Sequence, residues 1–254
     1  MALNLTWLDN NSWLWVLGGQ RILVDPWLVG TLTFGNQAWL FKGEHSLAPV
    51  LPEAIDLILL SQGLPDHAHP PTLAALDRSI PVLGSPGAAL VAQRLGYSDV
   101  TALDHGEIFT LGQLSIEAIV GAPIGPTTLE NGYILRDRPT GISLFYEPHG
   151  FHSPNLKTMG PIDAVITPVL DLTLPLVGPI IRGQKSALER VEWLQPQVLL
   201  PTAAASQTLY SGLLASLLKT LGTAAELQQY LHNRGYLTQV LSPTVGEPIA
   251  FPSA

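Results

Sequence analysis

The chain has 254 residues, of which 46% are hydrophobic and only 13% charged, as in a soluble protein with a large core. A net charge of −8 argues against non-specific nucleic-acid binding, which needs a basic surface. The absence of cysteine excludes disulfides and cysteine-based zinc sites. No apolar run approaches the roughly 20 residues that span a bilayer, and the N-terminus lacks the features of a signal peptide, so we expect a cytoplasmic protein.

The chain contains no internal repeat and no polar linker of low complexity. Its 23 glycines and 22 prolines are dispersed, which indicates many turns between short elements. We therefore predict a single domain over residues 1–254.

The first 24 residues predict three strands in consecutive hairpins, over residues 3–8, 12–17 and 21–24. Asp9, Asn10 and Asn11 form the first turn, because these residue types tolerate left-handed backbone. The third strand ends in Asp25-Pro26-Trp27.

Residues 29–51 are irregular but apolar, with Trp39 and Phe41 among the large side chains. Exposed apolar residues need a covering partner. Three interpretations remain open: a flap packed on its own domain, a wall for a hydrophobic substrate, or a docking surface for another protein.

Residues 55–60 form an apolar run of strand length, followed by breaks at Gly63 and Pro65. The loop after the break carries Asp66, His67 and His69, and prolines then open a helix. Polar side chains at the end of a buried strand are a common basis for a reactive site. The alternative is an ordinary turn in which Asp66 caps the helix and the histidines lie on the surface.

Strands and helices then alternate, which argues for α/β layering with parallel strands. His105 is predicted to be a solvated turn residue. The predicted helices span residues 71–76, 86–95, 184–194, 209–221 and 224–230. The predicted strands span residues 80–83, 100–103, 107–110, 114–120, 132–135, 142–146, 164–167, 198–200, 239–241 and 249–251.

Two further segments bear on function. Glu147, His149 and His152 follow a predicted strand, either as a polar surface loop or as part of the same site as Asp66 and His67. Residues 169–181 form a second apolar loop, which includes Leu174.

Ser61 to His67 resembles the metal-binding loop of the metallo-β-lactamase superfamily, His-x-His-x-Asp-His after an apolar strand. Asp66 and His67 match the last two positions, whereas Gln62 and Leu64 stand where the first two histidines would be. The Asp25-Pro26-Trp27 segment also resembles this superfamily, in which the matching aspartate is a structural hydrogen-bonding residue. The resemblance implies a four-layer αβ/βα sandwich, two mixed β-sheets with helices outside.

The resemblance also implies which metal ligands remain. Glu147 falls where the superfamily places a bridging aspartate. No residue from 121 to 126 can replace the third histidine through its side chain, and Thr202 and Ala203 stand at the final one. One divalent ion (Zn, Mn or Fe) can then be held by Asp66, His67 and Glu147, with a fourth donor from one of three histidines. These are His149, His152 and His69.

Three functions follow. The first is a mononuclear metal-dependent hydrolase of an apolar ester, lactone or phosphodiester, with Asp66 and His67 as catalytic residues. Its small apolar substrate is predicted to contact Trp39, Phe41, Gln62 and Leu174. The second is a metal-free protein that binds an apolar ligand, or a protein partner or second copy through loops 29–51 and 169–181. The third is a metal-free enzyme that uses Asp66 with His67 or His149.

Overall fold

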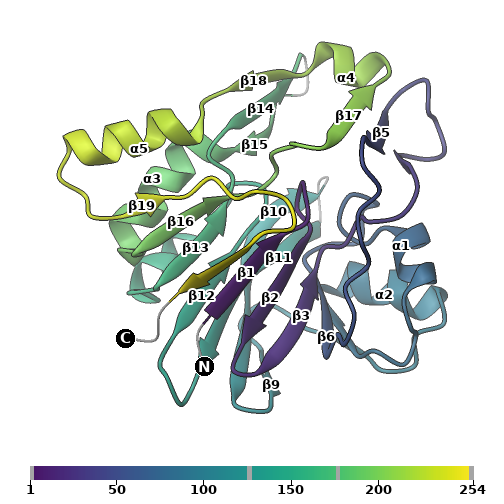
Figure 1. Cartoon of the computed structure of the whole chain (residues 1–254), viewed down its shortest axis with the longest axis horizontal. Helices are drawn as coiled ribbons and strands as arrows, with labels where there is room; N and C mark the ends of the chain where they lie inside the picture. Colours follow the sequence, from purple (N-terminus) through teal and green to yellow (C-terminus); the bar gives the residue numbers. More distant parts are fainter. Residues whose placement is uncertain (1–2, 125–127, 176–177, 252–254) are drawn as a thin grey trace.

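A computed structural model describes residues 3–124, 128–175 and 178–251. Two seven-stranded sheets pack face to face, and helices cover their outer faces (Figure 1). The predicted αβ/βα sandwich is therefore confirmed, and the predicted parallel strands are present in both sheets.

The first sheet has the order β20-β1-β2-β3-β6-β7-β8, antiparallel up to β3 and parallel beyond it. The bounds are β1 (Leu3–Trp7), β2 (Trp13–Leu17), β3 (Gln20–Val24), β6 (Leu57–Leu60), β7 (Val82–Gly84), β8 (Val100–Ala102) and β20 (Pro248–Phe251). Asp9 and Asn10 have positive φ angles of 83° and 51°, which makes the predicted turn between β1 and β2.

The second sheet has the order β19-β16-β13-β12-β11-β10-β9, with parallel pairing from β12 to β19. The bounds are β9 (Ile108–Leu111), β10 (Leu114–Ile124), β11 (Thr128–Asp137), β12 (Ser143–Tyr146), β13 (Ala164–Thr167), β16 (Val198–Pro201) and β19 (Gln239–Val240).

The main core lies between the two sheets, because alternate side chains of each strand point inward. Buried residues of both sheets, such as Leu5, Trp15, Leu135 and Leu144, belong to one apolar cluster. Two outer clusters lie under the helices. The helices are α1 (Pro70–Ala75) and α2 (Pro86–Arg94) on the first sheet, and α3 (Gly183–Leu194) and α5 (Ala224–Asn233) on the second.

Two small sheets lie outside the sandwich, where the sequence predicted irregular loops and a helix. Their orders are β17-β5-β4 and β15-β14-β18, and a short helix, α4, connects them. The bounds are β4 (Leu32–Thr33), β5 (Lys42–His45), β14 (Asp171–Leu174), β15 (Gly178–Arg182), β17 (Thr208–Ser211), α4 (Leu213–Leu217) and β18 (Lys219–Leu221). Residues 176–177 of the second predicted loop lie outside the described residues.

The single helix predicted over 209–221 is wrong. Gly212 has a φ of +98°, which breaks the helical path, and its neighbours pair with β5 as β17. No helix in the described parts of the chain is long and apolar enough to cross a membrane.

Candidate metal centre

Asp25 organises the end of the first sheet beside the loop after β6. Its Oδ1 accepts from the Ser61 amide at 2.7 Å, and its Oδ2 accepts from Ser61 Oγ at 2.6 Å and from Tyr146 Oη at 2.7 Å. His67 Nδ1 lies 2.7 Å from the same Oδ2. All four side chains are fully buried, so Asp25 is the structural hydrogen-bonding residue that the sequence predicted.

The bond to Asp25 fixes the orientation and tautomer of His67. A proton on Nδ1 leaves the lone pair of Nε2 free, which is the usual arrangement of a metal-binding histidine. His67 Nε2 lies 3.2 Å from Asp66 Oδ2 but has no hydrogen-bond partner, and Asp66 Oδ1 has none either.

His149 is oriented in the same way by a different carboxylate. Its Nδ1 lies 3.0 Å from Glu130 Oε1, which also accepts from the Ala122 amide at 3.0 Å. Glu130 is fully buried on β11. The ring centroids of His149 and His67 are 5.0 Å apart, so the two imidazoles are neighbours at the edge where the sheets meet.

Asp66, His67 and His149 each offer a ligand atom, and these atoms lie within 4.8 Å of one another. Buried polar atoms without partners are costly unless another group satisfies them. Two nitrogens and a carboxylate oxygen with an open position suit a catalytic Zn²⁺, and two histidines with one carboxylate also hold Fe²⁺. The residues present therefore fit one divalent ion.

Glu147, predicted to be a metal ligand, is engaged by protein hydrogen-bond donors. Its carboxylate accepts from Arg190 at 2.5 Å and from the backbone amides of His149, Gly150 and Phe151 at 2.7–3.1 Å. Burial raises the pKa of Glu147 to about 7, and the Arg190 guanidinium opposes this rise. Glu147 also belongs to a second group of neighbouring ligand atoms, with Glu130 and His149, but here it holds the loop and neutralises Arg190.

Negative charge dominates this region. Burial disfavours protonation of His67, but Asp66 and Asp25 outweigh it and raise the pKa of His67 well above its usual value. Glu130 likewise outweighs burial and raises the pKa of His149. The carboxylates thus attract positive charge to both imidazoles, which a bound cation can supply in place of protons.

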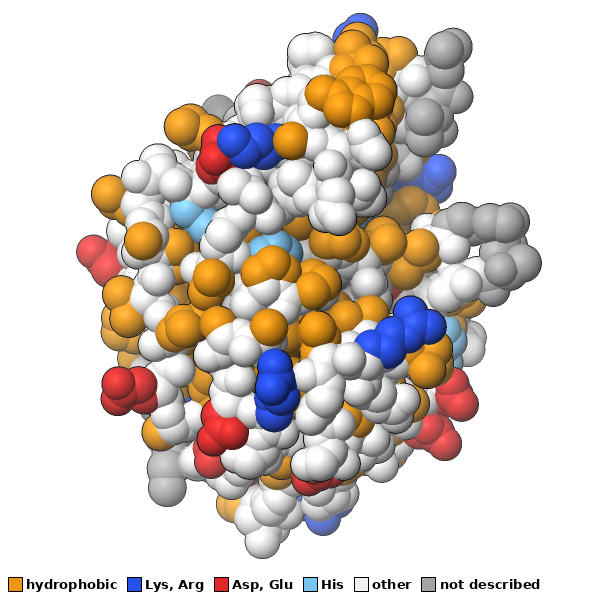
Figure 2. All heavy atoms as spheres, turned by 90° about the vertical axis from the view of Figure 1, so that its right-hand side faces the viewer, with side chains coloured by type: hydrophobic (Ala, Val, Ile, Leu, Met, Phe, Trp, Pro, Cys, Tyr) orange, Lys and Arg blue, Asp and Glu red, His pale blue; other side chains and the backbone are white. Residues whose placement is uncertain are grey.

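Asp66 and His149 lie at the wall of a cavity of about 570 Å³. Most of its other lining residues are apolar, and about half of them come from the two small sheets and α4. They include Leu32, Phe34, Phe41, Leu172, Leu174, Ile181 and Leu214. Figure 2 shows hydrophobic side chains gathered over this face, with histidine atoms visible between them.

The other predicted site residues are distributed differently. Phe41 and Leu174 line the cavity, whereas Trp39 is 67% exposed outside it and Gln62 is buried without lining it. His69 Nδ1 lies 3.0 Å from Thr72 Oγ1, and its Nε2 lies 3.3 Å from the Thr31 carbonyl. His152 pairs with Glu189 at 3.1 Å. Both histidines thus have protein partners away from the group of Asp66, His67 and His149.

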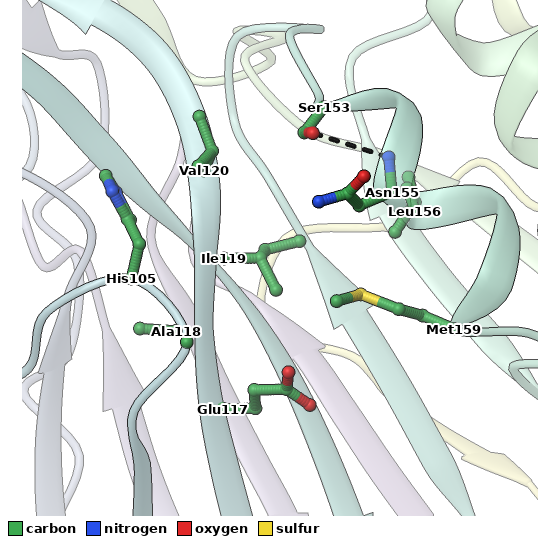
Figure 3. A pocket seen from close by; sticks show the side chains of 10 residues that line it. His105, Glu117, Ala118, Ile119, Val120, Ser153, Asn155, Leu156 and Met159 are labelled. Carbon is green, nitrogen blue, oxygen red and sulfur yellow. Dashed lines mark hydrogen bonds between the residues drawn. The ribbon is translucent and has the colours of Figure 1, made fainter.

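A second cavity of about 220 Å³ lies on the outer side of β10, next to a 3₁₀ helix over Pro154–Thr158 (Figure 3). Ile119, Leu156 and Met159 point into it, and Ser153 Oγ accepts from the Asn155 amide at its rim. His105 is exposed there, as predicted, and its Nε2 lies 3.0 Å from the Glu130 carbonyl. None of the residues that line this cavity belongs to the metal-ligand groups.

Comparison with known proteins agrees with this architecture. The family model described as a beta-lactamase superfamily domain matches residues 4–203. The chain belongs to the metallo-β-lactamase superfamily. A comparison with curated proteins gives no match.

Three solved structures illustrate the likeness in fold. A novel metallo hydrolase from the hyperthermophilic archaeon Ignicoccus hospitalis is 16% identical, with 99% of each chain covered and a TM-score of 0.69. An isothiocyanate hydrolase from Delia radicum gut bacteria is 18% identical, with 99% of this chain and 100% of that chain covered and a TM-score of 0.70. A possible metal-dependent hydrolase from Veillonella parvula is 13% identical, with the same coverage and a TM-score of 0.74. At these identities the likeness concerns the fold.

Thr202 shows what replaces a lost superfamily histidine. Its Oγ1 accepts from Trp13 Nε1 at 3.1 Å and lies 3.1 Å from Asn11 Oδ1. The position therefore belongs to a neutral hydrogen-bond network. Residues 125–127, next to the expected third histidine, lie outside the described residues.

Proposed function

We propose that this chain is a mononuclear metal-dependent hydrolase whose ion is held by Asp66, His67 and His149. The observation that carries the proposal is the convergence of these three donors within 4.8 Å, with each imidazole backed by a buried carboxylate. Zn²⁺, Mn²⁺ and Fe²⁺ all suit this donor set. When bound, such an ion makes water acidic enough to attack at neutral pH.

The chain's own residues have separable roles in this reaction. Asp25 and Glu130 hold the two imidazoles in place. The unpartnered oxygen of Asp66 can accept a proton from the attacking water. In ester hydrolysis the water oxygen bonds to the acyl carbon, the bond to the alcohol oxygen breaks, and the alcohol leaves with a proton. The apolar cavity binds the remainder of the substrate and excludes water from it.

Metal content tests the proposal. After incubation with Zn²⁺, Mn²⁺ or Fe²⁺ and removal of free ion, we expect near-stoichiometric metal in the wild type by mass spectrometry. Asp66→Ala and His149→Ala should lose most of it, while His232→Ala, which changes an exposed histidine on α5, should not. A wild-type protein that remains empty with all three ions would contradict the proposal.

A second candidate function is metal-free binding of an apolar small molecule in the same cavity. It is favoured by the pairing of Glu147 with Arg190 and backbone amides, which engages both carboxylate oxygens of one predicted ligand. Exposed apolar residues of loop 29–51, such as Trp39, Leu47 and Val50, support in addition a protein partner or a second copy, for which loops 29–51 and 169–181 are the predicted docking surface. Tight ligand binding by metal-free protein, without hydrolysis, would favour this function.

A further inference from the structure

We infer that Asn11 donates a hydrogen bond from Nδ2 to the carbonyl oxygen of a neutral, apolar ester or lactone bound in the cavity. This inference rests on the proposed function, which it narrows to a substrate class, and it adds a substrate-binding residue. It starts from the polar groups on the cavity wall, because a few placed polar groups set specificity in an apolar pocket.

The charge of the cavity wall distinguishes anionic phosphodiesters from neutral esters and lactones, the three predicted substrate classes. None of the described lining residues is lysine or arginine, and Asp66 is acidic. Binding sites for phosphodiesters place cationic groups or helix N-termini at the phosphate. Apart from His149 and the proposed ion, the described wall has no cationic group to hold an anion, so a neutral carbonyl compound fits the rest of the cavity better.

Most polar side chains on the wall are already engaged. Asn10 donates to Thr208 Oγ1 and accepts from Tyr210, and Trp27 Nε1 donates to the Gly30 carbonyl. Thr220 is exposed on β18. Asn11 is different, because no described residue accepts a hydrogen bond from its Nδ2 although the residue is only 7% exposed.

The amide of Asn11 contacts the Thr202 hydroxyl. Its Oδ1 lies 3.1 Å from Thr202 Oγ1, which accepts from Trp13 Nε1 and shares its single proton between this oxygen and the Asn10 carbonyl at 3.2 Å. With Oδ1 engaged by the Thr202 hydroxyl, Nδ2 remains as the free donor. The residue that replaces the final superfamily histidine thus positions a neutral donor.

Asn11 also lies beside the metal donors. It lines the same cavity as Asp66 and His149. Tyr146 Oη lies 3.4 Å from the Asn11 carbonyl oxygen and 2.7 Å from Asp25, which holds His67. A donor in this place strengthens its bond as the carbonyl oxygen gains negative charge during water attack, which lowers the barrier rather than only improving binding.

The first test uses a ligand that cannot be hydrolysed. Methyl hexyl ketone, labelled with carbon-13 at the carbonyl, is added to wild-type protein, and its carbonyl stretch is recorded by infrared difference spectroscopy. We expect a shift to lower frequency in the wild type that is lost in Asn11→Leu, together with roughly tenfold weaker binding. Asn155→Leu, the same change at an exposed position outside the cavity, should behave as wild type.

Thr202 variants test the positioning role. Thr202→Val should lose the carbonyl shift, and Thr202→Ser, which keeps the hydroxyl, should retain it. Equal carbonyl frequency and affinity in wild type and Asn11→Leu would overturn the inference. An absence of ketone binding by folded wild-type protein would overturn it as well.

Hydrolysis provides a second, separate readout. With metal-loaded protein, p-nitrophenyl butyrate should be cleaved in preference to bis(p-nitrophenyl) phosphate, and Asn11→Leu should lower kcat/KM about a hundredfold, through a higher KM and a lower kcat. A preference for the phosphodiester would overturn the substrate class. A retained carbonyl shift in protein that neither binds metal nor cleaves the ester would instead refute the proposed function and leave Asn11 as a ligand-binding residue.

Discussion

Arg190 is a fully buried cation whose charge is balanced by the carboxylate of Glu147. Its guanidinium bonds to Glu147 Oε2, to the Phe151 carbonyl and to Thr167. Since a buried charge without a partner is far more costly than a paired one, the guanidinium ties α3 to the loop that carries His149. Its contribution to the site is therefore indirect, through the position of that loop.

Breaking this pair should destabilise the protein strongly. We expect Arg190→Met or Glu147→Gln to lower the free energy of unfolding by about 3–5 kcal/mol, because each leaves a buried polar partner behind. The double variant should be more stable than the sum of both losses implies. Urea denaturation of the four proteins measures this, and additive losses would show that the two groups do not interact.

A substitution at Glu130 should change metal affinity without removing a metal ligand. Glu130→Gln weakens the acceptor of the His149 Nδ1 proton, and such indirect partners typically change metal affinity 10–100-fold. Titration calorimetry with Zn²⁺ should show a loss of about this size. Glu117→Gln, on the partly exposed face of β10, is the control that should bind as wild type.

The metal donors could be proposed from the sequence, but the buried residues that position them could not. Asp66, His67 and His149 each follow a predicted strand, so their residue types and places were visible. Glu130 is a single acid within a long strand, and Arg190 stands among the polar residues of an amphipathic helix. Only folding places Glu130 against His149 and Arg190 against Glu147.

At the scale of elements, the loop after β12 is locked to the start of α3. The His149 carbonyl accepts from the Arg182 amide at 2.9 Å, and Gly150 donates to Glu147. Gly150 has a φ of +81°, and a Cβ there would collide with the Arg182 carbonyl. Glycine is therefore required at this junction.

Gly150→Ala should consequently disturb both stability and the site. Left-handed backbone alone costs an L-residue about 1–2 kcal/mol, and the collision adds to it. We expect a lower midpoint of thermal unfolding and reduced Zn²⁺ binding, measured by calorimetry. Gly106→Ala, at a positive φ but with nothing near its Cβ, is the matched control, and its metal binding should be unchanged.

The errors in the predicted elements have a common cause. Within each strand and helix of the sandwich, the spacing of apolar residues is regular enough to predict the element from the sequence. By contrast, β5 and β17 are short and pair across more than 160 residues of sequence, as Thr208 with His45. Such pairing leaves little local periodicity, and the apolar spacing of 209–221 resembled a helix.

His152 should contribute an acid-sensitive part of the stability of the whole molecule. Burial lowers the pKa of His152 to about 4 from its usual 6.5, with Arg190 and Lys185 acting in the same direction. Between these values the unfolded chain binds a proton that the folded protein does not. The free energy of unfolding therefore falls as pH falls from about 6.5 to about 4.

Replacing His152 isolates this contribution. The His152→Gln variant has no titrating side chain at position 152. Its free energy of unfolding, measured by urea denaturation, should therefore fall less than that of the wild type between pH 7 and pH 4. Identical pH dependence of the two proteins would exclude His152 as a source of acid sensitivity. His232→Gln, on α5, is a control expected to follow the wild type.

The cavity walls and the metal donors belong to different parts of the architecture. About half of the wall residues come from β4, β14, β15, β17, β18 and α4, whereas Asp66 and His149 stand at strand ends of the sandwich. Mutations can thus accumulate in the small sheets without disturbing the core that holds the donors. Side chains that line the cavity can therefore change while the strand ends that carry Asp66 and His149 keep their positions, so one sandwich can hold cavities of different shape.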